Sequence, residues 1–333
     1  MYIGDEGITE MRRLKIVQVI SNVPNARPIP SRKEGGTEKI VYELTESLVK
    51  RGHHVYVFAA KGSRTSARLI TYPQHLKKKG IRQFVLKKMP PKVDIIHDHT
   101  FNSAIGKARI KVPTICTLHM PSRNRVRFPV YVSKRARAVM GKNRGYYVYN
   151  GINPKEYEFS SIKKDYLLFM GRIIKEKGIL HAIEIAEKTR KQLIIAGPIK
   201  DKALFRKKIL PRILRNPRIH YVGAVGGKRK QNLLKHASCL LFPSTWEEPF
   251  GLVMIEAMAC GTPVIALKRG AVSEVLAGFP QLICHTVSEM IEKVNKGYYP
   301  SPYLLRNYVK RRFSRDRMVT RYVHLYRKLV RRK

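Results

Sequence analysis

Residues 248–266 constrain the fold of this chain more than any other stretch. The segment opens with a turn at Pro249 and Gly251 and continues as an apolar run of helical character. It stops at Gly261 and then enters a short, β-branched stretch at 264–265. This order predicts a loop, a helix and a strand in succession.

Two carboxylates in this segment, Glu248 and Glu256, indicate its chemistry. If residues 250–260 are helical, the two lie about 80° apart around the axis and at most roughly 12 Å apart along it, so both face one side. Free N–H groups at a helix start attract phosphate, and carboxylates accept hydrogen bonds from sugar hydroxyls. The alternative is a pair of solvated charges on an amphipathic helix. Because Glu256 has apolar neighbours on nearly all sides, we expect it to be packed and to need a partner.

Residues 248–266, together with Gly-Ala-Val-Ser-Glu-Val at 270–275, resemble the signature of the retaining glycosyltransferases of family 4. The resemblance covers nearly the whole chain after Leu14. It implies an α/β protein of the GT-B type, with two Rossmann-like domains facing each other across a cleft and a C-terminal helix that crosses back to the first domain. The expected parts are residues 14–155, 156–312 and 313–333.

The remaining pattern agrees with two α/β halves, because strands and helices alternate along the chain and imply parallel sheets covered on both faces. A polar stretch after Asn-Gly-Ile-Asn at 150–153 marks the hinge between the halves. The expected strands are 15–20, 53–59, 93–96, 113–118, 131–133, 146–149, 166–170, 192–197, 219–223 and 238–244; the expected helices include 37–51, 286–297 and 301–331.

Gly35 and Gly36 stand between the first strand and the first helix. Glycines there allow backbone N–H groups to approach a diphosphate, although a simple turn is the alternative. The resemblance implies that Gly35 and Gly36 lie near the donor phosphates.

Histidines close two expected strands, at His97-Asp98-His99 and at His119. Open α/β sheets place ligands at such strand ends, although a structural histidine is the alternative. The resemblance places His99 near the donor sugar, with His119 as the second choice. We expect His119 and Arg123, in the loop that follows, on the acceptor side, where Arg123 either binds an acceptor phosphate or only adds to the positive field. His-x-His is also a metal-like pair, but no third ligand has suitable spacing, so we expect no metal.

A second strand, loop and helix unit carries cations at Arg172 and Lys177. An arginine can fork onto a phosphate, and a lysine adds a point charge. The spacing Gly-Arg-x4-Lys-Gly resembles the diphosphate motif of the family. With 67 Lys and Arg in the chain, cations in one loop would mean little without that spacing.

The resemblance implies transfer of a sugar from a nucleotide diphosphate sugar to an acceptor hydroxyl, with retention at the anomeric carbon and without a cofactor or metal. No residue is an obvious nucleophile, which agrees with a front-face mechanism. Glu256 would hold the ribose and Glu248 the donor sugar. The diphosphate would meet Arg172, Lys177 and the backbone of Phe250, Gly251 and Leu252.

The formal net charge of +44 favours anionic partners without choosing among them. The basic run at 75–88 is either a solvated helix face or a patch for an anionic membrane. No motif indicates specific nucleic acid binding. Four scattered cysteines and the lack of a bilayer-length apolar run favour a cytoplasmic protein, with peripheral contact at the inner face of the membrane left open.

Other functions remain open from the residues alone. One alternative is a nucleotide-sugar epimerase or a phosphorylase on the same fold, against which Glu248, Glu256, Arg172 and Lys177 argue together. Another is a non-catalytic scaffold that binds anionic membrane or nucleic acid through its basic surface. The sugar, the base and the acceptor, whether glycan, lipid or small molecule, stay undetermined.

Overall fold

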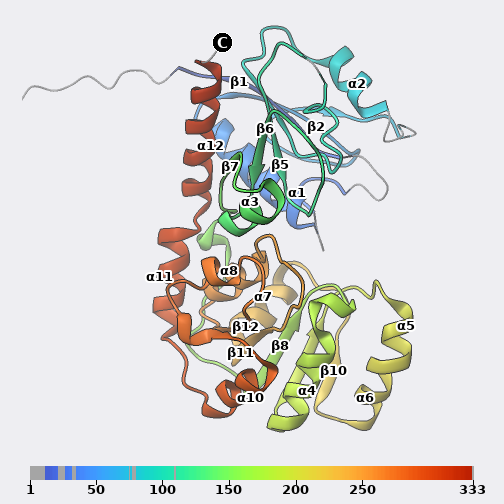
Figure 1. The fold of residues 1–333 in the computed structure, drawn as a ribbon, viewed down its shortest axis with the longest axis vertical. Coiled ribbons are helices and arrows are strands. Elements are labelled where there is room, and N and C mark those ends of the chain that lie inside the picture. Colours follow the sequence, from blue (N-terminus) through green and yellow to red (C-terminus); the bar gives the residue numbers. More distant parts are fainter. Residues whose placement is uncertain are drawn as a thin grey trace, which may run out of the picture.

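The computed structural model describes residues 12–21, 27–31, 35–74, 76, 80–108 and 110–331 of the 333-residue chain. Two parallel sheets, each covered by helices, lie one above the other (Figure 1). The first has seven strands in the order β3-β2-β1-β4-β5-β6-β7, and the second has six in the order β10-β9-β8-β11-β12-β13. The prediction of two Rossmann-like domains is confirmed.

The first domain begins with β1 at Lys15–Val19 and α1 at Gly36–Lys50. Strands β4 and β5 are buried at every position, as expected of central strands covered on both faces. The other elements are β2 (His54–Ala59), β3 (Arg68–Thr71), α2 (Ile81–Lys88), β4 (Ile95–Asp98), β5 (Thr114–Leu118), β6 (Phe128–Tyr131), α3 (Lys134–Gly141) and β7 (Tyr146–Tyr147). Of the basic run 75–88, residues 75 and 77–79 lie outside the described residues.

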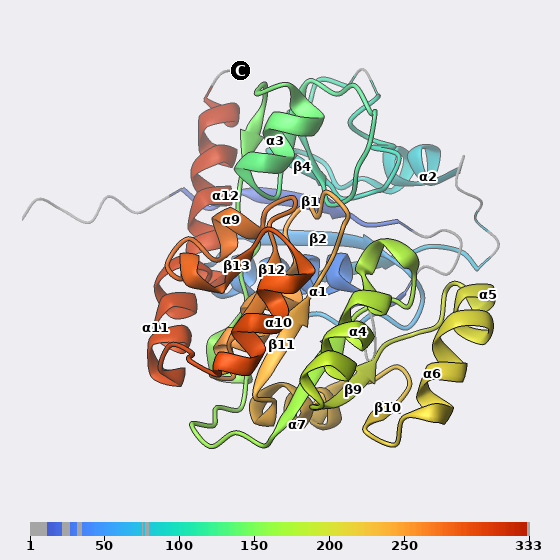
Figure 2. The same ribbon diagram turned by 60° about the horizontal axis from the view of Figure 1, so that its bottom comes forward.

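The second domain repeats the alternation of strands and helices. Figure 2 shows α4 and α10 in front of its sheet. The side chains of neighbouring residues on its strands pack alternately into two cores, one on each face of the sheet. Its elements are β8 (Tyr166–Met170), α4 (Ile179–Thr189), β9 (Gln192–Ala196), α5 (Lys202–Leu204), α6 (Leu210–Arg215), β10 (Ile219–Tyr221), α7 (Gly227–His236), β11 (Cys239–Phe242), α8 (Leu252–Ala259), β12 (Val264–Leu267), α9 (Val272–Val275), β13 (Ile283–Cys284) and α10 (Val287–Lys296).

The C-terminal segment departs from the expected single helix at 301–331. It forms two helices, α11 at Pro302–Arg312 and α12 at Arg315–Val330. The hydroxyl of Ser314 caps α12 by accepting from the backbone N–H of Arg317. Backbone bonds to Ile152 flank this break, because Ile152 donates to the carbonyl of Phe313 and accepts from Arg315. The linker between the domains, at Ile152, therefore takes up backbone groups that a continuous helix would have used.

The break sends the two helices to different domains (Figure 1). Helix α11 packs on α8 in the second domain, and α12 packs on α1 in the first. Tyr322 and Tyr326 of α12 are fully buried, and the Tyr326 hydroxyl lies 2.7 Å from Nδ1 of His97. Helix α12 is thus part of the core of the first domain. Among the described residues, none of the helices has the length and apolar content needed to cross a bilayer.

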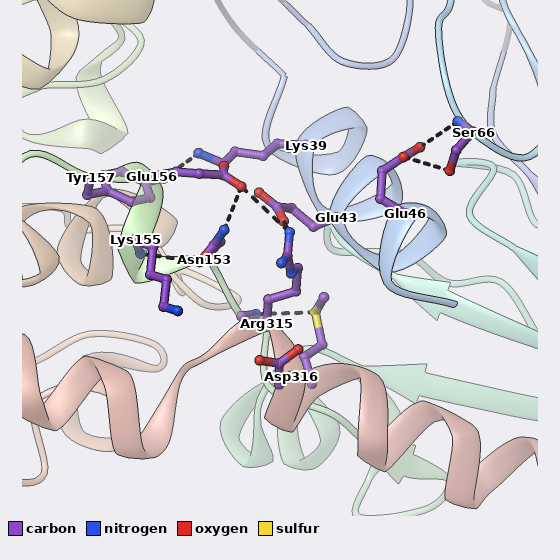
Figure 3. A network of polar contacts seen from close by, with 12 residues as sticks. Lys39, Glu43, Glu46, Ser66, Asn153, Lys155, Glu156, Tyr157, Arg315 and Asp316 are labelled. Atoms are coloured by element: carbon purple, nitrogen blue, oxygen red, sulfur yellow. Dashed lines mark hydrogen bonds and ion pairs between the residues drawn. The ribbon is translucent and has the colours of Figure 1, made fainter. Parts of the chain in front are cut away.

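An ion cluster joins α1, the linker and α12 (Figure 3). Arg315 Nη1 lies 3.0 Å from Glu43 and 3.6 Å from Glu156, and the Glu43 side chain is only 3% exposed. Burial raises the pKa of Glu43, and the charge of Glu156 adds to the rise. The charge and hydrogen bond of Arg315 oppose it. Arg315 therefore compensates a carboxylate that water cannot reach.

Arg315→Ala should destabilise the fold, because it leaves Glu43 buried without its cation. We expect a loss of roughly 3 kcal/mol in the free energy of unfolding at neutral pH. The raised pKa favours the folded protein at low pH, and this contribution is lost as the pH rises through the folded-state value. Urea unfolding should therefore show a larger loss at pH 8 than at pH 5. Arg317→Ala, on the exposed side of the same helix, is the control, and equal losses from both variants would contradict the argument.

Candidate active site

A cavity of about 400 Å³ lies between the two domains. The first domain contributes the start of α1, and the second contributes strand ends, the turn before α7 and the start of α8. The charged side chains that line it are Lys39, Lys177, Lys230, Glu248 and Glu256. Three cations and two carboxylates thus meet in one cleft.

Two helices begin at this cavity. Helix α1 starts after Gly35, whose φ is 122°, and α8 starts after Gly251, whose φ is 84°. These left-handed conformations favour glycine, and neither residue has a side chain to occupy the first N–H groups of its helix. Gly35, Gly36, Gly251 and Leu252 line the cavity. The start of α8 can accept an anion there, whereas the Glu38 carboxylate lies beside Gly35 at the start of α1.

The helical geometry expected for the two carboxylates is wrong at its start. Helix α8 begins at Leu252, so Glu248 belongs to the preceding loop. The Pro-Phe-Gly turn changes the direction of the chain between them, yet both carboxylates still line the cavity. The side chain of Phe250 is buried against Tyr149 and Phe313, at ring distances of 6.2 and 5.7 Å. This packing anchors the loop between Glu248 and Gly251 on the side chains of the core.

Glu256 has hydrogen-bond and ion-pair partners, as its apolar surroundings predicted. Its carboxylate accepts from the Tyr157 hydroxyl at 2.9 Å and from Lys230 at 2.6 Å, and Lys39 lies 3.4 Å away. Burial alone would raise the pKa of Glu256, but the charges of Lys230 and Lys39 and the hydrogen bonds lower it to about 2. The carboxylate is therefore ionised at neutral pH, although only 4% of it is exposed.

Lys39 reaches across the cleft. It extends from α1 of the first domain toward Tyr157 in the second (Figure 3). Its ammonium lies 4.6 Å from the centre of the Tyr157 ring and 3.4 Å from the Glu256 carboxylate. Lys39 also donates to the Tyr157 hydroxyl. The same side chain thus lines the cavity and ties the two domains together.

A second ion pair joins Lys177 to Glu248, and both side chains are largely buried. The Lys177 ammonium lies 5.5 Å from the centre of the Trp246 indole ring, and the Arg172 guanidinium lies 5.6 Å from the centre of the same ring. Lys177 lines the cavity, whereas Arg172 does not, although its neighbour Gly171 does. Both cations thus contact the ring of Trp246, and Lys177 also faces the cavity.

The histidines line a second cavity of about 150 Å³, next to Thr37 and Glu38 at the start of α1. His99 Nδ1 lies 3.1 Å from His119 Nε2, and His99 Nε2 lies 3.2 Å from the Gln18 side-chain oxygen. Burial lowers the pKa of His99 well below its ordinary value and that of His119 to about 4. Both imidazoles are neutral at pH 7 and suit hydroxyl groups. Arg123 is exposed and lines neither cavity.

The remaining members of the His-Asp-His motif serve the fold. His97 contacts the hydroxyls of Tyr326 and Thr117, each at 2.7 Å, and Asp98 accepts from backbone N–H groups of the following loop. Among the described residues, no group of three or more His, Cys, Asp or Glu has the arrangement of a metal site.

Two family models match consecutive parts of the chain. Glycosyltransferase Family 4 matches residues 34–156, and Glycosyl transferases group 1 matches residues 154–296. The chain belongs to the group 1, family 4 glycosyltransferases. The glycine pair, His99 and His119 fall in the first match, and Arg172, Lys177, Glu248 and Glu256 fall in the second.

Similar proteins agree with this family. An uncharacterized glycosyltransferase of Methanocaldococcus jannaschii is 31% identical over 148 residues, which are 39% of this chain and 37% of that protein's length. AviGT4, involved in avilamycin A biosynthesis, is 26% identical with a TM-score of 0.81, covering 95% of this chain and 98% of its own. Anabaena HepE, solved with UDP and glucose, is 17% identical with a TM-score of 0.76, covering 95% and 100%.

Sequence reasoning missed three side chains of this glycosyltransferase site: Lys39, Lys230 and Tyr157. Each contacts Glu256 in the structure. The available signals were the position of Lys39 in the first turn after the glycine pair and that of Lys230 just after Gly226-Gly227. Neither stands out among 67 cations.

Lys230→Ala should destabilise the folded glycosyltransferase by roughly 2 kcal/mol at pH 7, because the buried Glu256 loses its nearest cation. The depressed pKa of Glu256 gives a contribution that is complete above its unfolded value near 4.5 and is lost as the pH falls toward 2. Denaturant unfolding should thus show the difference from wild type shrinking with acid. Lys235→Ala, on the same helix but paired with the half-exposed Glu158, is the matched control. A pH-independent difference would refute the assignment.

Proposed function

We propose that this chain is a retaining glycosyltransferase that moves a sugar from a nucleotide diphosphate sugar to an acceptor hydroxyl. The observation that carries the proposal is the interdomain cavity, in which a buried, ionised Glu256 and the Lys177–Glu248 pair lie beside two helix starts. Carboxylates for hydroxyls next to cations for phosphates match the two ends of such a donor.

The donor is proposed to lie along the second domain. Glu256 accepts from the ribose hydroxyls, and the diphosphate lies at the start of α8, where Lys177 and Arg172 neutralise it. Glu248 accepts from hydroxyls of the transferred sugar. The base packs in the turn before α7, where Ala224 and Val225 line the cavity.

The reaction breaks the bond between the anomeric carbon and the diphosphate oxygen and forms a bond from the acceptor oxygen on the same face. The acceptor proton passes to the departing phosphate oxygen. Charge therefore develops on the diphosphate, and preorganised N–H groups and cations stabilise it there. We propose that these protein groups suffice without a metal ion or another cofactor.

The acceptor is proposed to approach through the histidine cavity. His99 and His119 are neutral, so they exchange hydrogen bonds with hydroxyls and add no charge for a phosphate. A hydroxyl-bearing glycan, lipid or small molecule fits this chemistry. The proposal includes a cytoplasmic setting with peripheral contact to anionic membrane.

The test is a screen of thermal shift and turnover against UDP-, GDP-, ADP- and TDP-sugars, with and without EDTA. A UDP-sugar is the first choice, because HepE, which has the same fold, was solved with UDP. We expect one nucleotide family to raise the melting temperature with EDTA present and to be hydrolysed slowly. The anomeric proton coupling of a product should show retention.

Glu256→Gln and Arg172→Ala should each weaken donor binding by about tenfold or more while the protein stays folded, because each removes a charge-assisted contact. Glu247→Gln is the matched control, since this neighbouring carboxylate pairs with the exposed Arg135. Unchanged donor affinity in both site variants would refute the residue assignment. No shift with any donor would instead favour a basic scaffold without turnover.

A further inference from the structure

A separate cavity of about 450 Å³ lies in the first domain, between the edge strand β7 and α12. Figure 1 shows α3, β7 and α12 beside one another at this place. None of the residues that line this cavity also lines the histidine cavity or the interdomain cavity proposed to bind the donor, which is called the donor cavity from here on. It therefore belongs to neither part of the site described above.

The walls of this cavity are cationic. Arg137 of α3 and Arg321 and Lys328 of α12 line it together with His324, and none of the described residues that line it carries a carboxylate. Within the part of the chain that the structure describes, none of these three permanent cations has a carboxylate partner within ion-pair distance. Their charges remain available to a ligand.

Aromatic rings support these cations without neutralising them. The Arg137 guanidinium lies 5.2 Å from the centre of the Tyr147 ring, and the Lys328 ammonium lies 5.8 Å from that of Tyr146. Arg321 lies 5.9 Å from the Tyr149 ring. Cation–π contacts of this kind orient a charged group while leaving its N–H donors free to bind.

One donor in the cavity wall lacks an acceptor. Nε of Arg137 is buried and has no hydrogen-bond partner among the described residues. Buried donors are nearly always paired, and leaving one unpaired costs about 1–3 kcal/mol. The Arg137 guanidinium is therefore short of acceptors, and a ligand in the cavity would reach it through nitrogens other than this buried Nε.

We propose that this cavity binds the phosphate group of an organic anion. Two guanidinium groups can each fork onto phosphate oxygens, and Lys328 adds a point charge. Val148, Leu325 and the tyrosine rings form an apolar wall, which a bare phosphate would leave unused. The ligand is therefore a phosphate joined to an apolar group, from either a lipid headgroup or a soluble organophosphate. This inference does not rest on the proposed function.

Because the chain carries a formal +44, the experiment must separate this cavity from the general positive field. The test variant is Arg137→Ala with Arg321→Ala. The matched control is Lys207→Ala with Lys208→Ala, which removes the same charge from exposed positions between α5 and α6. Lys177→Ala reports phosphate bound in the donor cavity. Arg137→Lys keeps the charge and tests the guanidinium at low risk to folding.

Isothermal titration with inorganic phosphate, at constant ionic strength, measures the shared chemistry. We expect the test variant to lose affinity by about tenfold or more, Arg137→Lys to lose less, and the control pair to stay within about twofold of wild type. Equal losses in the test and control pairs, or a loss confined to Lys177→Ala, would overturn the proposal.

Co-sedimentation with phosphatidylcholine vesicles, with and without phosphatidic acid, identifies the source of the phosphate. If it is a lipid headgroup, the test variant loses binding to the phosphatidic acid vesicles and the control pair keeps it. If it is a soluble organophosphate, phosphate affinity falls while vesicle binding stays unchanged. No change in either measurement would overturn the proposal.

Discussion

The ionised carboxylate of Glu256, buried in the cleft, is the charge around which the two domains are arranged. Water cannot solvate it, so its negative charge depends on Lys230, Lys39 and the Tyr157 hydroxyl. Lys39 belongs to the opposite domain, and its contact therefore stabilises the carboxylate and the approach of the domains at once. Any ligand hydroxyl that bonds to Glu256 enters a site whose geometry is already set by these contacts.

A second buried carboxylate, Glu43, is also neutralised by a cation, and this ion pair lies where the chain crosses between the domains. Glu43 is buried on α1, and Arg315 meets it only because α12 begins where it does. The start of α12 is fixed in turn by the Ser314 cap and by the backbone pairing of Ile152. The linker, the helix break and the ion cluster thus form one structural unit. Because α1 carries both Glu43 and Lys39, this unit also orients the side chain that spans the cleft.

The two-domain fold and the two carboxylates of the site could be predicted from the sequence. Alternating strands and helices and the 248–266 segment carry local, periodic signals. The same reasoning required a partner for Glu256 but could not name it, since Lys39, Tyr157 and Lys230 approach it from three separate segments. Helical periodicity continues through Phe313, so the division into α11 and α12 depends on a tertiary pairing with Ile152. The Gly-Arg-x4-Lys-Gly spacing, through its resemblance to the family motif, predicts that Arg172 binds phosphate. Only the structure shows that its guanidinium lies over the Trp246 ring.

The interdomain cavity and the histidine cavity differ in their charged groups, and the net charge of the whole chain does not reveal this difference. A formal +44 attracts anions to the whole surface, and the interdomain cavity has three lysines and two carboxylates at its walls, so one positive charge is left over there. The histidine cavity differs, because burial keeps His99 and His119 neutral and each is held by a side-chain neighbour. An anionic group therefore gains more from the donor cavity than from the histidine cavity, while a hydroxyl finds hydrogen-bond partners in both. Desolvation of two imidazoles thus gives the two cavities different preferences for anions and hydroxyls.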